Sequence, residues 1–260
     1  MTRVLSALVL LPIVIGTIWF LPPLATLVLA AVAAVLAFVE YADIARALDA
    51  HVPRLLAGTA VLAACVSVGL QSGATDAVLM TATIVIGALA VASGQPGPAI
   101  LRDAAAAVLP IVYIGLPLGA LAAVRALAGR EAVLLLLVVI VVSDSAQYYT
   151  GRAFGRRPLA PSISPKKTLE GAIGGMVFGT IAMAAGGAAV FTAPGWTLAL
   201  LGAALAALGI VGDLFESLLK RGAGVKDSSN LIPGHGGVLD RIDSWLFAAP
   251  VYYVFVRLVA

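Results

Sequence analysis

Polar side chains suited to phosphate and metal chemistry gather between residues 217 and 243. Acids, cations and glycines follow one another there: Ser217, Lys220, Arg221, Lys226, Asp227, His235, Gly236, Gly237, Asp240, Arg241 and Asp243. Asp240 and Asp243 are three residues apart, so on a helix they would share one face. Carboxylates that close repel each other unless a cation lies between them, and Mg²⁺ prefers carboxylate oxygens together with water and phosphate oxygens. Two acids at this spacing are more often a solvated helix face, but lysines and a glycine-rich turn beside them predict a metal and phosphate site.

A second polar segment comes earlier in the chain. Asp144 follows an apolar run, and the stretch Ser164-Pro165-Lys166-Lys167-Thr168 directly precedes a predicted helix over residues 171–192. The N-terminus of a helix offers free N–H groups and a positive dipole end, which suit phosphate. We therefore expect Lys166 and Lys167 to contact phosphate, against the alternative that they only anchor the chain at a membrane surface.

Acids at the ends of apolar stretches also call for an explanation. An Asp at the centre of a membrane span costs about 2.5–3.5 kcal/mol, and ionisable residues in spans usually line a polar cavity. Asp213 ends one stretch and precedes Ser217 by four residues, so the two share a helix face. His235 stands in the turn Pro-Gly-His-Gly-Gly, where backbone can approach a ligand closely. Both positions predict site residues.

The elements that must position these residues are apolar helices. Of the 260 residues, 62% are hydrophobic and 11% charged, whereas soluble domains carry about 25% charged residues. A helix that crosses the bilayer needs about 20 apolar residues. The stretches that qualify are 4–21, 24–42, 55–71, 76–93, 104–124, 132–150, 171–192, 196–216 and 239–258. The fold class predicted is an all-α, polytopic membrane protein with about nine transmembrane helices.

The positive charges give the predicted helices an orientation. With nine spans, all but three of the 16 lysines and arginines fall on one side, the exceptions being Arg125, Arg130 and Arg257. The positive-inside rule assigns the crowded side to the cytoplasm. We expect one membrane domain over 1–260, with apolar helices in 1–130 and the active site in 131–260, and with the N-terminus and the polar segments cytoplasmic.

The run from Ser217 to Asp243 resembles the signature of the bacterial-type phosphatidate cytidylyltransferase (CDP-diacylglycerol synthase) family. That pattern is Ser, two residues, Lys-Arg, four residues, Lys-Asp, a Pro-Gly-His-Gly-Gly turn, and Asp-Arg-hydrophobic-Asp, and this chain matches it at every polar position. The stretch 164–171 and the segment from Asp144 to Arg152 are also similar to the family. One difference is Asp144-Ser145-Ala146-Gln147-Tyr148, where the family often has Asp-Thr-Gly-Ala-Tyr. The resemblance covers about residues 140–245.

The resemblance implies an enzyme that converts CTP and phosphatidic acid into CDP-diacylglycerol and pyrophosphate during phospholipid biosynthesis. It implies one or two Mg²⁺ ions, a homodimer among membrane lipids, no nucleic-acid partner, and an active site at the cytoplasmic leaflet of the bacterial inner membrane. In this reading Asp213, Asp240 and Asp243 bind metal, with Asp144 and Asp227 as further members. The basic residues hold the triphosphate or the lipid phosphate, Gly236 and Gly237 give room for phosphate, and Ser217 and His235 complete the polar pocket, with Arg241 between its acids. The acids and lysines are expected to meet in one pocket.

Two other functions remain open from the sequence. A transporter or channel also carries acids within its spans, although it would spread them across the membrane depth. A CTP-dependent lipid kinase would bind the same nucleotide, and only its products would distinguish it. A CDP-alcohol phosphatidyltransferase would carry its own Asp-Gly…Ala-Arg motif, which the chain lacks.

Overall fold

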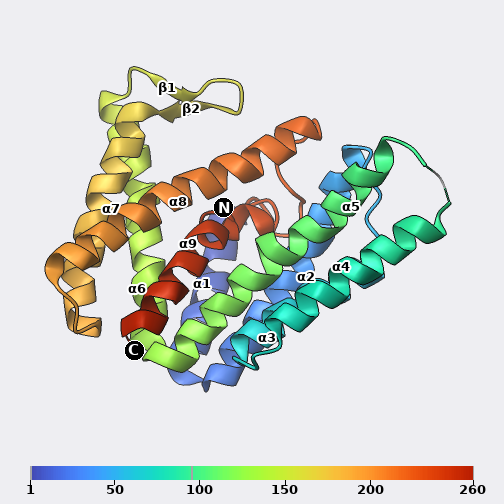
Figure 1. Ribbon diagram of the computed structural model, residues 1–260. Helices are drawn as coiled ribbons and strands as arrows, with labels where there is room; N and C mark the ends of the chain where they lie inside the picture. Colours follow the sequence, from blue (N-terminus) through green and yellow to red (C-terminus); the bar gives the residue numbers. More distant parts are fainter. Residues whose placement is uncertain (1, 95, 260) are drawn as a thin grey trace. The chain divides into compact units, whose positions relative to one another are not determined.

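The structure is a computed structural model that describes residues 2–94 and 96–259, with side chains from residue 8 onward. Its elements in chain order are α1 (Thr2–Phe20), α2 (Pro23–Ala47), α3 (Arg54–Gly69), α4 (Thr75–Ala92), α5 (Ala99–Pro110), the π-helical turn η1 (Ile111–Gly115), α6 (Leu116–Phe154), β1 (Pro158–Ala160), β2 (Ser164–Thr168), α7 (Leu169–Val190), α8 (Gly195–Gly222) and α9 (Leu239–Val259) (Figure 1). The predicted helical fold class is confirmed.

Six helical segments of the described chain are long and apolar enough to cross a membrane. They are α2, α4, the continuous stretch Ala99–Phe154, α7, α8 and α9. The chain is therefore a polytopic membrane protein, but the count differs from the nine predicted. Two predicted spans, 4–21 and 55–71, coincide with shorter apolar helices, and the spans 104–124 and 132–150 lie within a single helical segment. Nine crossings of the membrane stay a prediction.

The long helical segment is interrupted at the position where the sequence predicts a connection between spans. Gly129 has φ 84° and ψ −177° inside α6, a conformation that residues with a Cβ rarely adopt. Further toward the N-terminus, the π-helical turn η1 lies between Pro110 and Pro117. Each proline lacks the N–H group that an α-helix needs at its position. The π turn replaces the usual hydrogen bonds here with bonds between residues five apart.

The chain forms two compact units. The first comprises Met1–Ala123 and Gly222–Arg241, and the second Val124–Arg221 and Ile242–Ala260. The second unit begins close to the predicted division at residue 130, whereas Gly222–Arg241 belongs with the N-terminal helices because it bonds to α2. That the whole chain acts as one membrane domain stays a prediction.

Small residues allow close helix packing in the first unit. Here α2 packs on α3, α3 packs on η1 and α4, and α4 packs on α5. Ala57, Ala64 and Cys65 of α3 are completely buried. A Cβ on Gly115 would lie 2.7 Å from the carbonyl oxygen of Val61. Cys65 is a free thiol buried in this core, where a cysteine packs as a small apolar side chain.

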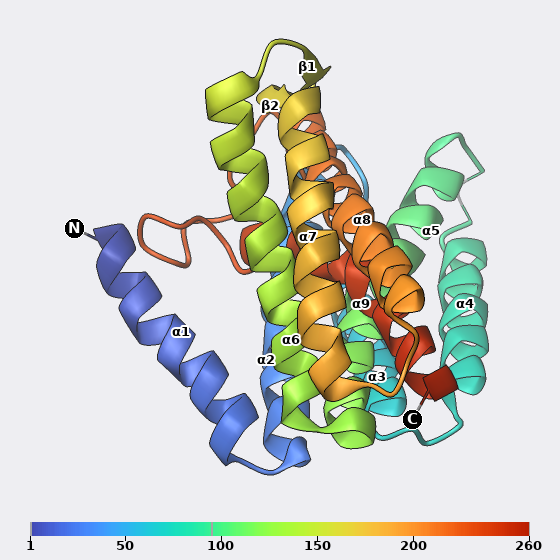
Figure 2. The same ribbon diagram turned by 90° about the vertical axis from the view of Figure 1, so that its left-hand side faces the viewer.

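A glycine stripe brings α6, α7 and α8 of the second unit into close contact. A Cβ on Gly171 would lie 2.7 Å from the carbonyl oxygen of Gln147 on α6. Four residues along α7, a Cβ on Gly175 would meet the carbonyl oxygen of Ser143 at 3.0 Å, and at Gly179 the neighbour is Ala206 of α8. Figure 2 shows α6 and α7 running side by side. The stripe is the close-contact surface that small residues provide in membrane helices.

A short hairpin precedes α7, in the segment between the predicted spans 132–150 and 171–192. Strands β1 and β2 pair in antiparallel fashion, with Pro158 opposite Thr168 and Ala160 opposite Ser164. Short strands rich in Pro, Ser and Lys lack the β-branched and aromatic residues that signal a strand, so local pattern does not predict them. Side chains alternate between the two sides of a strand, and accordingly Lys166 is exposed while Lys167 is half-buried.

We predict opposite effects of alanine at two glycines. Gly171→Ala should lower the free energy of unfolding by about 1–3 kcal/mol, because its methyl group would overlap the α6 backbone. Gly87→Ala on α4 is the matched control, since nothing lies within 4 Å of a Cβ there, and alanine favours a helix by about 1 kcal/mol over glycine. Thermal unfolding in detergent measures both. Equal effects of the two substitutions would contradict the packing assigned to Gly171.

Candidate functional site

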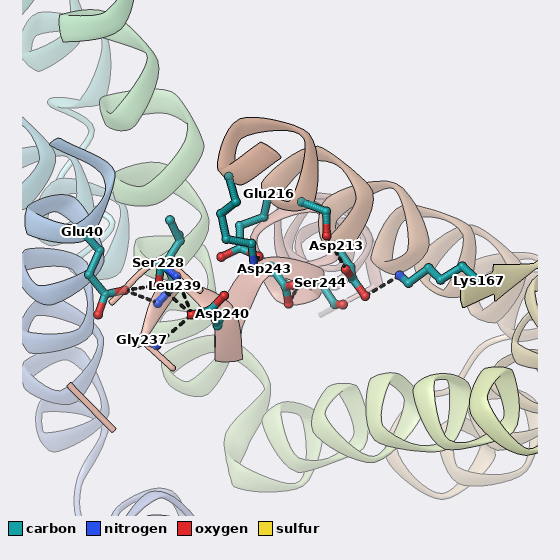
Figure 3. A network of polar contacts seen from close by, with 12 residues as sticks. Glu40, Lys167, Asp213, Glu216, Ser228, Gly237, Leu239, Asp240, Asp243 and Ser244 are labelled. Atoms are coloured by element: carbon teal, nitrogen blue, oxygen red, sulfur yellow. Dashed lines mark hydrogen bonds and ion pairs between the residues drawn. The ribbon is translucent and has the colours of Figure 1, made fainter. Parts of the chain in front are cut away.

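The second unit joins a lysine and an aspartate that are 46 residues apart in the sequence. Lys167 Nζ on β2 donates to Asp213 Oδ2 on α8, and Ser217 Oγ donates to Asp213 Oδ1 over 3.4 Å (Figure 3). The side chains of Lys167 and Asp213 are 22% and 32% exposed. The predicted approach of the lysine segment to Asp213, and the shared face of Asp213 and Ser217, are confirmed.

Two further carboxylates lie close enough to Asp213 for their charges to repel its charge. Asp144 of α6 and Asp243 of α9 each interact with the charge of Asp213. Gln147 Nε2 donates to Asp144 Oδ1 over 3.0 Å, and the Ser244 N–H donates to Asp243 Oδ1 over 2.7 Å. Three helices therefore contribute one acid each to the region around the Asp213 carboxylate, which also bonds Lys167. Gln147, which marks the departure from the family pattern, holds the first of these acids.

Local sequence explains how Lys167 and Asp243 reach this region. Thr168 caps α7, because its hydroxyl accepts the Gly171 N–H over 3.1 Å, as threonine does at many helix N-termini. Glu170 in the first turn accepts the N–H groups of Arg156 and Arg157 and so ties the chain entering β1 to the same helix end. On the other side, a Cβ on Gly212 would meet the Asp243 carbonyl oxygen at 2.5 Å. Only glycine at that position lets α8 and α9 approach so closely.

The predicted metal ligands are distributed over several elements of the chain. Over the part of the chain that the structure describes, no group of three or more His, Cys, Asp or Glu side chains is placed to hold a metal ion. Mg²⁺ usually needs only one or two carboxylates besides water and substrate phosphates. Asp213 and Asp243 fit that smaller demand within the second unit. The metal-binding roles of Asp144, Asp213, Asp227, Asp240 and Asp243 stay predictions.

A second ion pair of this unit is buried. Lys220 Nζ donates to Glu216 Oε2 one turn away on α8, and the two side chains are 9% and 1% exposed. The pair forms because α8 continues to Gly222, beyond the predicted end at residue 216, so both residues lie on a helix. Contact between Lys220 and a phosphate stays a prediction, and in this conformation its ammonium group already bonds a carboxylate.

The Pro-Gly-His-Gly-Gly segment of the first unit has a defined conformation. The His235 N–H donates to the Ile232 carbonyl over 2.9 Å, and Gly234 has φ 77°. Proline followed by a residue with positive φ is the pattern of a type II turn. The Ile232 N–H in turn donates to the carbonyl oxygen of Gly236, a residue with φ 82°. Glycine is therefore required at both positions by the backbone itself.

Two carboxylates accept hydrogen bonds from donors on both sides of this turn, and one of them, Glu40, was not among the site residues predicted from the sequence. Glu40 of α2 is buried and accepts the Ser228 and Ser229 hydroxyls at 2.9 and 2.7 Å and the Val238 and Leu239 N–H groups at 2.9 and 2.8 Å. Asp240 Oδ2 accepts the Ser228 N–H and hydroxyl and the Gly237 N–H, all at 2.7–2.8 Å (Figure 3).

These bonds change the interpretation of the turn. The sequence predicted that the turn accommodates phosphate through its backbone. In the structure three consecutive N–H groups, those of Gly237, Val238 and Leu239, already donate to carboxylates. Phosphate binding by Gly236 and Gly237 stays a prediction. The signal for Glu40 was present, because it is the single acid within the predicted span 24–42, where a charge is costly.

The remaining predicted site residues lie at the surface of their units. The exposed members are Lys166, Arg221, Lys226, Asp227 and Arg241, and His235 is half-buried. Asp240 belongs to the first unit and Lys167 to the second. The prediction that both meet in one pocket therefore stays a prediction.

Comparison with known proteins identifies the family of the chain. The sequence model of the cytidylyltransferase family matches residues 1–259. The chain belongs to the cytidylyltransferase family. Phosphatidate cytidylyltransferase of Helicobacter pylori is 44% identical over 144 residues, which cover 55% of this chain and 53% of that protein. The enzyme of the same name from Haemophilus influenzae is 47% identical over 134 residues, 47% of this chain and 45% of that protein. The chain spans about half the length of the curated relatives it matches.

We predict that the buried ion pair of this family member is essential to its stability. Lys220→Met should lower the free energy of unfolding by about 3–5 kcal/mol, because the Glu216 carboxylate would stay buried without its cation. Arg221→Met is the control, since it removes an equal charge from the exposed neighbouring position. Unfolding in mixed micelles measures both variants, and a loss of similar size in the control would refute the prediction.

Proposed function

We propose that the protein is a phosphatidate cytidylyltransferase that makes CDP-diacylglycerol and pyrophosphate from CTP and phosphatidic acid. The observation that carries the proposal is the contact of Lys167 with Asp213, with Asp144 and Asp243 beside it. This combination of a cation with acids from three helices suits a polyphosphate with a divalent ion. Membership of the cytidylyltransferase family and the names of the relatives from Helicobacter pylori and Haemophilus influenzae support it.

The proposed reaction exchanges one phosphorus–oxygen bond for another. An oxygen of the phosphatidic acid phosphate forms a bond to the α-phosphorus of CTP, the bond from that phosphorus to the bridging oxygen breaks, and pyrophosphate leaves with the electron pair. Such transfers ask the protein for positioning and charge neutralisation rather than for a covalent nucleophile. Lys167 would neutralise phosphate oxygens, while Ser217 orients Asp213. Bound Mg²⁺, held by Asp213 and Asp243, would supply Lewis-acid stabilisation of the charge that develops on the phosphates.

The finer topology belongs to the same proposal. We place the protein in the bacterial inner membrane as a homodimer with nine crossings, a cytoplasmic N-terminus and the active site at the cytoplasmic leaflet. The distribution of lysine and arginine along the sequence supports the orientation. It also suits the substrates, since CTP is dissolved in the cytosol and the phosphate of phosphatidic acid lies at the membrane surface.

The first test identifies the products. Purified protein incubated with phosphatidic acid, CTP labelled in its base, and Mg²⁺ should release pyrophosphate and transfer the label to the lipid. Chelation of the divalent ion should abolish the reaction, and added Mg²⁺ should restore it. Release of labelled CDP would identify a CTP-dependent lipid kinase instead, and a protein that forms neither product would refute the proposal.

The second test compares the two adjacent lysines. Lys167→Gln should lower kcat/KM for CTP by at least about 100-fold, a loss typical of removing one group that stabilises transition-state charge. Lys166→Gln, on the opposite side of β2, is the matched control and should lower it less than about fivefold. Steady-state kinetics in detergent–lipid micelles measure both variants. Equal losses would contradict the assignment of the reacting region to the side of Lys167.

A further inference from the structure

The carboxylate of Glu40 joins two segments of the first unit that are almost 200 residues apart in the sequence. It receives four hydrogen bonds, all of them from Ser228, Ser229, Val238 and Leu239. From this geometry we propose that Glu40 is a positioning residue, which holds the segment 228–239 and the first turn of α9 in the conformation that the reaction requires. The proposal rests on the proposed function, which gives Asp243 a metal-holding role, and on the site roles that the family resemblance implies for His235 and Asp240.

The burial of Glu40 indicates that its carboxylate is stabilised by the hydrogen bonds it accepts from this segment. Only 4% of the residue is exposed, and an isolated carboxylate in such surroundings would be strongly unfavourable. Four donors compensate for the lost water, and two of them are the N–H groups of Val238, directly before α9, and of Leu239, the first residue of α9. A negative charge at this place also interacts favourably with the dipole of the helix. The carboxylate therefore acts as an N-terminal cap supplied by a different helix.

The network is closely packed at Gly237. A Cβ at Gly237 would overlap both the Ser228 hydroxyl and the Glu40 carboxylate, so glycine is required there by packing. The Ser228 hydroxyl lies 2.9 Å from Glu40 and 2.8 Å from Asp240. Its single hydrogen can point to only one of the two carboxylates at a time, so the two acids share this hydroxyl and belong to one network. A change at Glu40 is transmitted to Asp240 through this hydroxyl.

This arrangement gives Glu40 an effect on the reaction without contact with substrate. Asp240 is oriented by Ser228 and Gly237, and both of these lie in the segment that Glu40 holds. Asp243 follows one turn later on α9, whose first residue is Leu239. Loss of the Glu40 bonds should therefore free the start of α9 together with the turn before it, and the acids on that helix should lose their fixed orientation.

The experiment measures local opening and catalysis in the full-length protein in detergent–lipid micelles. Glu40→Gln keeps the size of the side chain but removes the charge and one acceptor, so peptides covering residues 226–240 should exchange their amide hydrogens at least about tenfold faster. The kcat for CDP-diacylglycerol formation should fall at least tenfold at a temperature where the variant remains folded. Asp43→Asn, one turn further along α2 and on an exposed acid that bonds Arg54, is the matched control and should change neither quantity.

The outcomes separate the inference from the proposed function. Unchanged exchange in 226–240, or faster exchange spread evenly over all helices, would overturn the positioning role, and so would local opening with an unchanged kcat. If Glu40→Gln does not fold, Ser229→Ala takes its place, because it removes one of the hydroxyl donors to Glu40. Amide exchange in 226–240 must then be faster than in the wild type, by a smaller factor than is expected for Glu40→Gln. Unchanged exchange there would overturn the inference. A wild-type protein that makes no CDP-diacylglycerol would overturn the proposed function, whereas the exchange measurement still decides whether Glu40 holds the segment.

Discussion

A carboxylate within an apolar helix needs a cation or several hydrogen-bond donors beside it, because burial removes the water that would otherwise stabilise its charge. Asp213 meets this demand with Lys167, and Glu216 meets it with Lys220. Glu40 meets it with hydroxyl and backbone donors. For Asp213 and Glu40 the partners come from distant parts of the sequence. The cost of burying these acids thus determines which segments must come together.

Glycine makes the close approach of those segments possible. Gly171 brings α7 to the backbone of α6 just after the strand that carries Lys167, and Gly212 brings α8 to the backbone of α9 just before Asp213. In both places a methyl group would separate the helices at a charged residue. Small residues at membrane helix contacts usually serve packing alone. Here they also determine the distance between charged groups on neighbouring elements.

The proposed cytidylyl transfer would account for a site of this kind among apolar helices. Polyphosphate and lipid phosphate are both anions, so a protein that brings them together must supply cations and exclude water at the same place. Lys167 is half-buried beside its acids, whereas Lys166 on the other side of β2 remains exposed. In the proposed reaction, Lys167 would thereby face the reacting region while its neighbour Lys166 lies at a solvated surface.

Much of this organisation could be predicted from sequence, because it depends on local pattern. Apolar runs of about 20 residues predict helices wherever they occur, and the motif from Ser217 to Asp243 indicates the family that the whole-chain match confirms. The shared face of Asp213 and Ser217 also follows from helical periodicity alone. The number of membrane crossings does not follow from hydropathy in the same way. Some apolar runs are close to the minimum length for a span, and the helical stretch Ala99–Phe154 covers two predicted spans in one continuous segment.

Only the tertiary structure decided how the charges are paired. Nothing near Glu40 in the sequence indicates that it caps a helix that begins at Leu239, and nothing near Lys167 shows that it contacts Asp213 while Lys166 does not. The hairpin β1–β2 likewise forms from residues with weak strand preference. The reason is physical: helix formation depends on hydrogen bonds and side chains within a few residues, whereas a buried charge is stabilised by whichever donors the folded chain brings within about 3 Å.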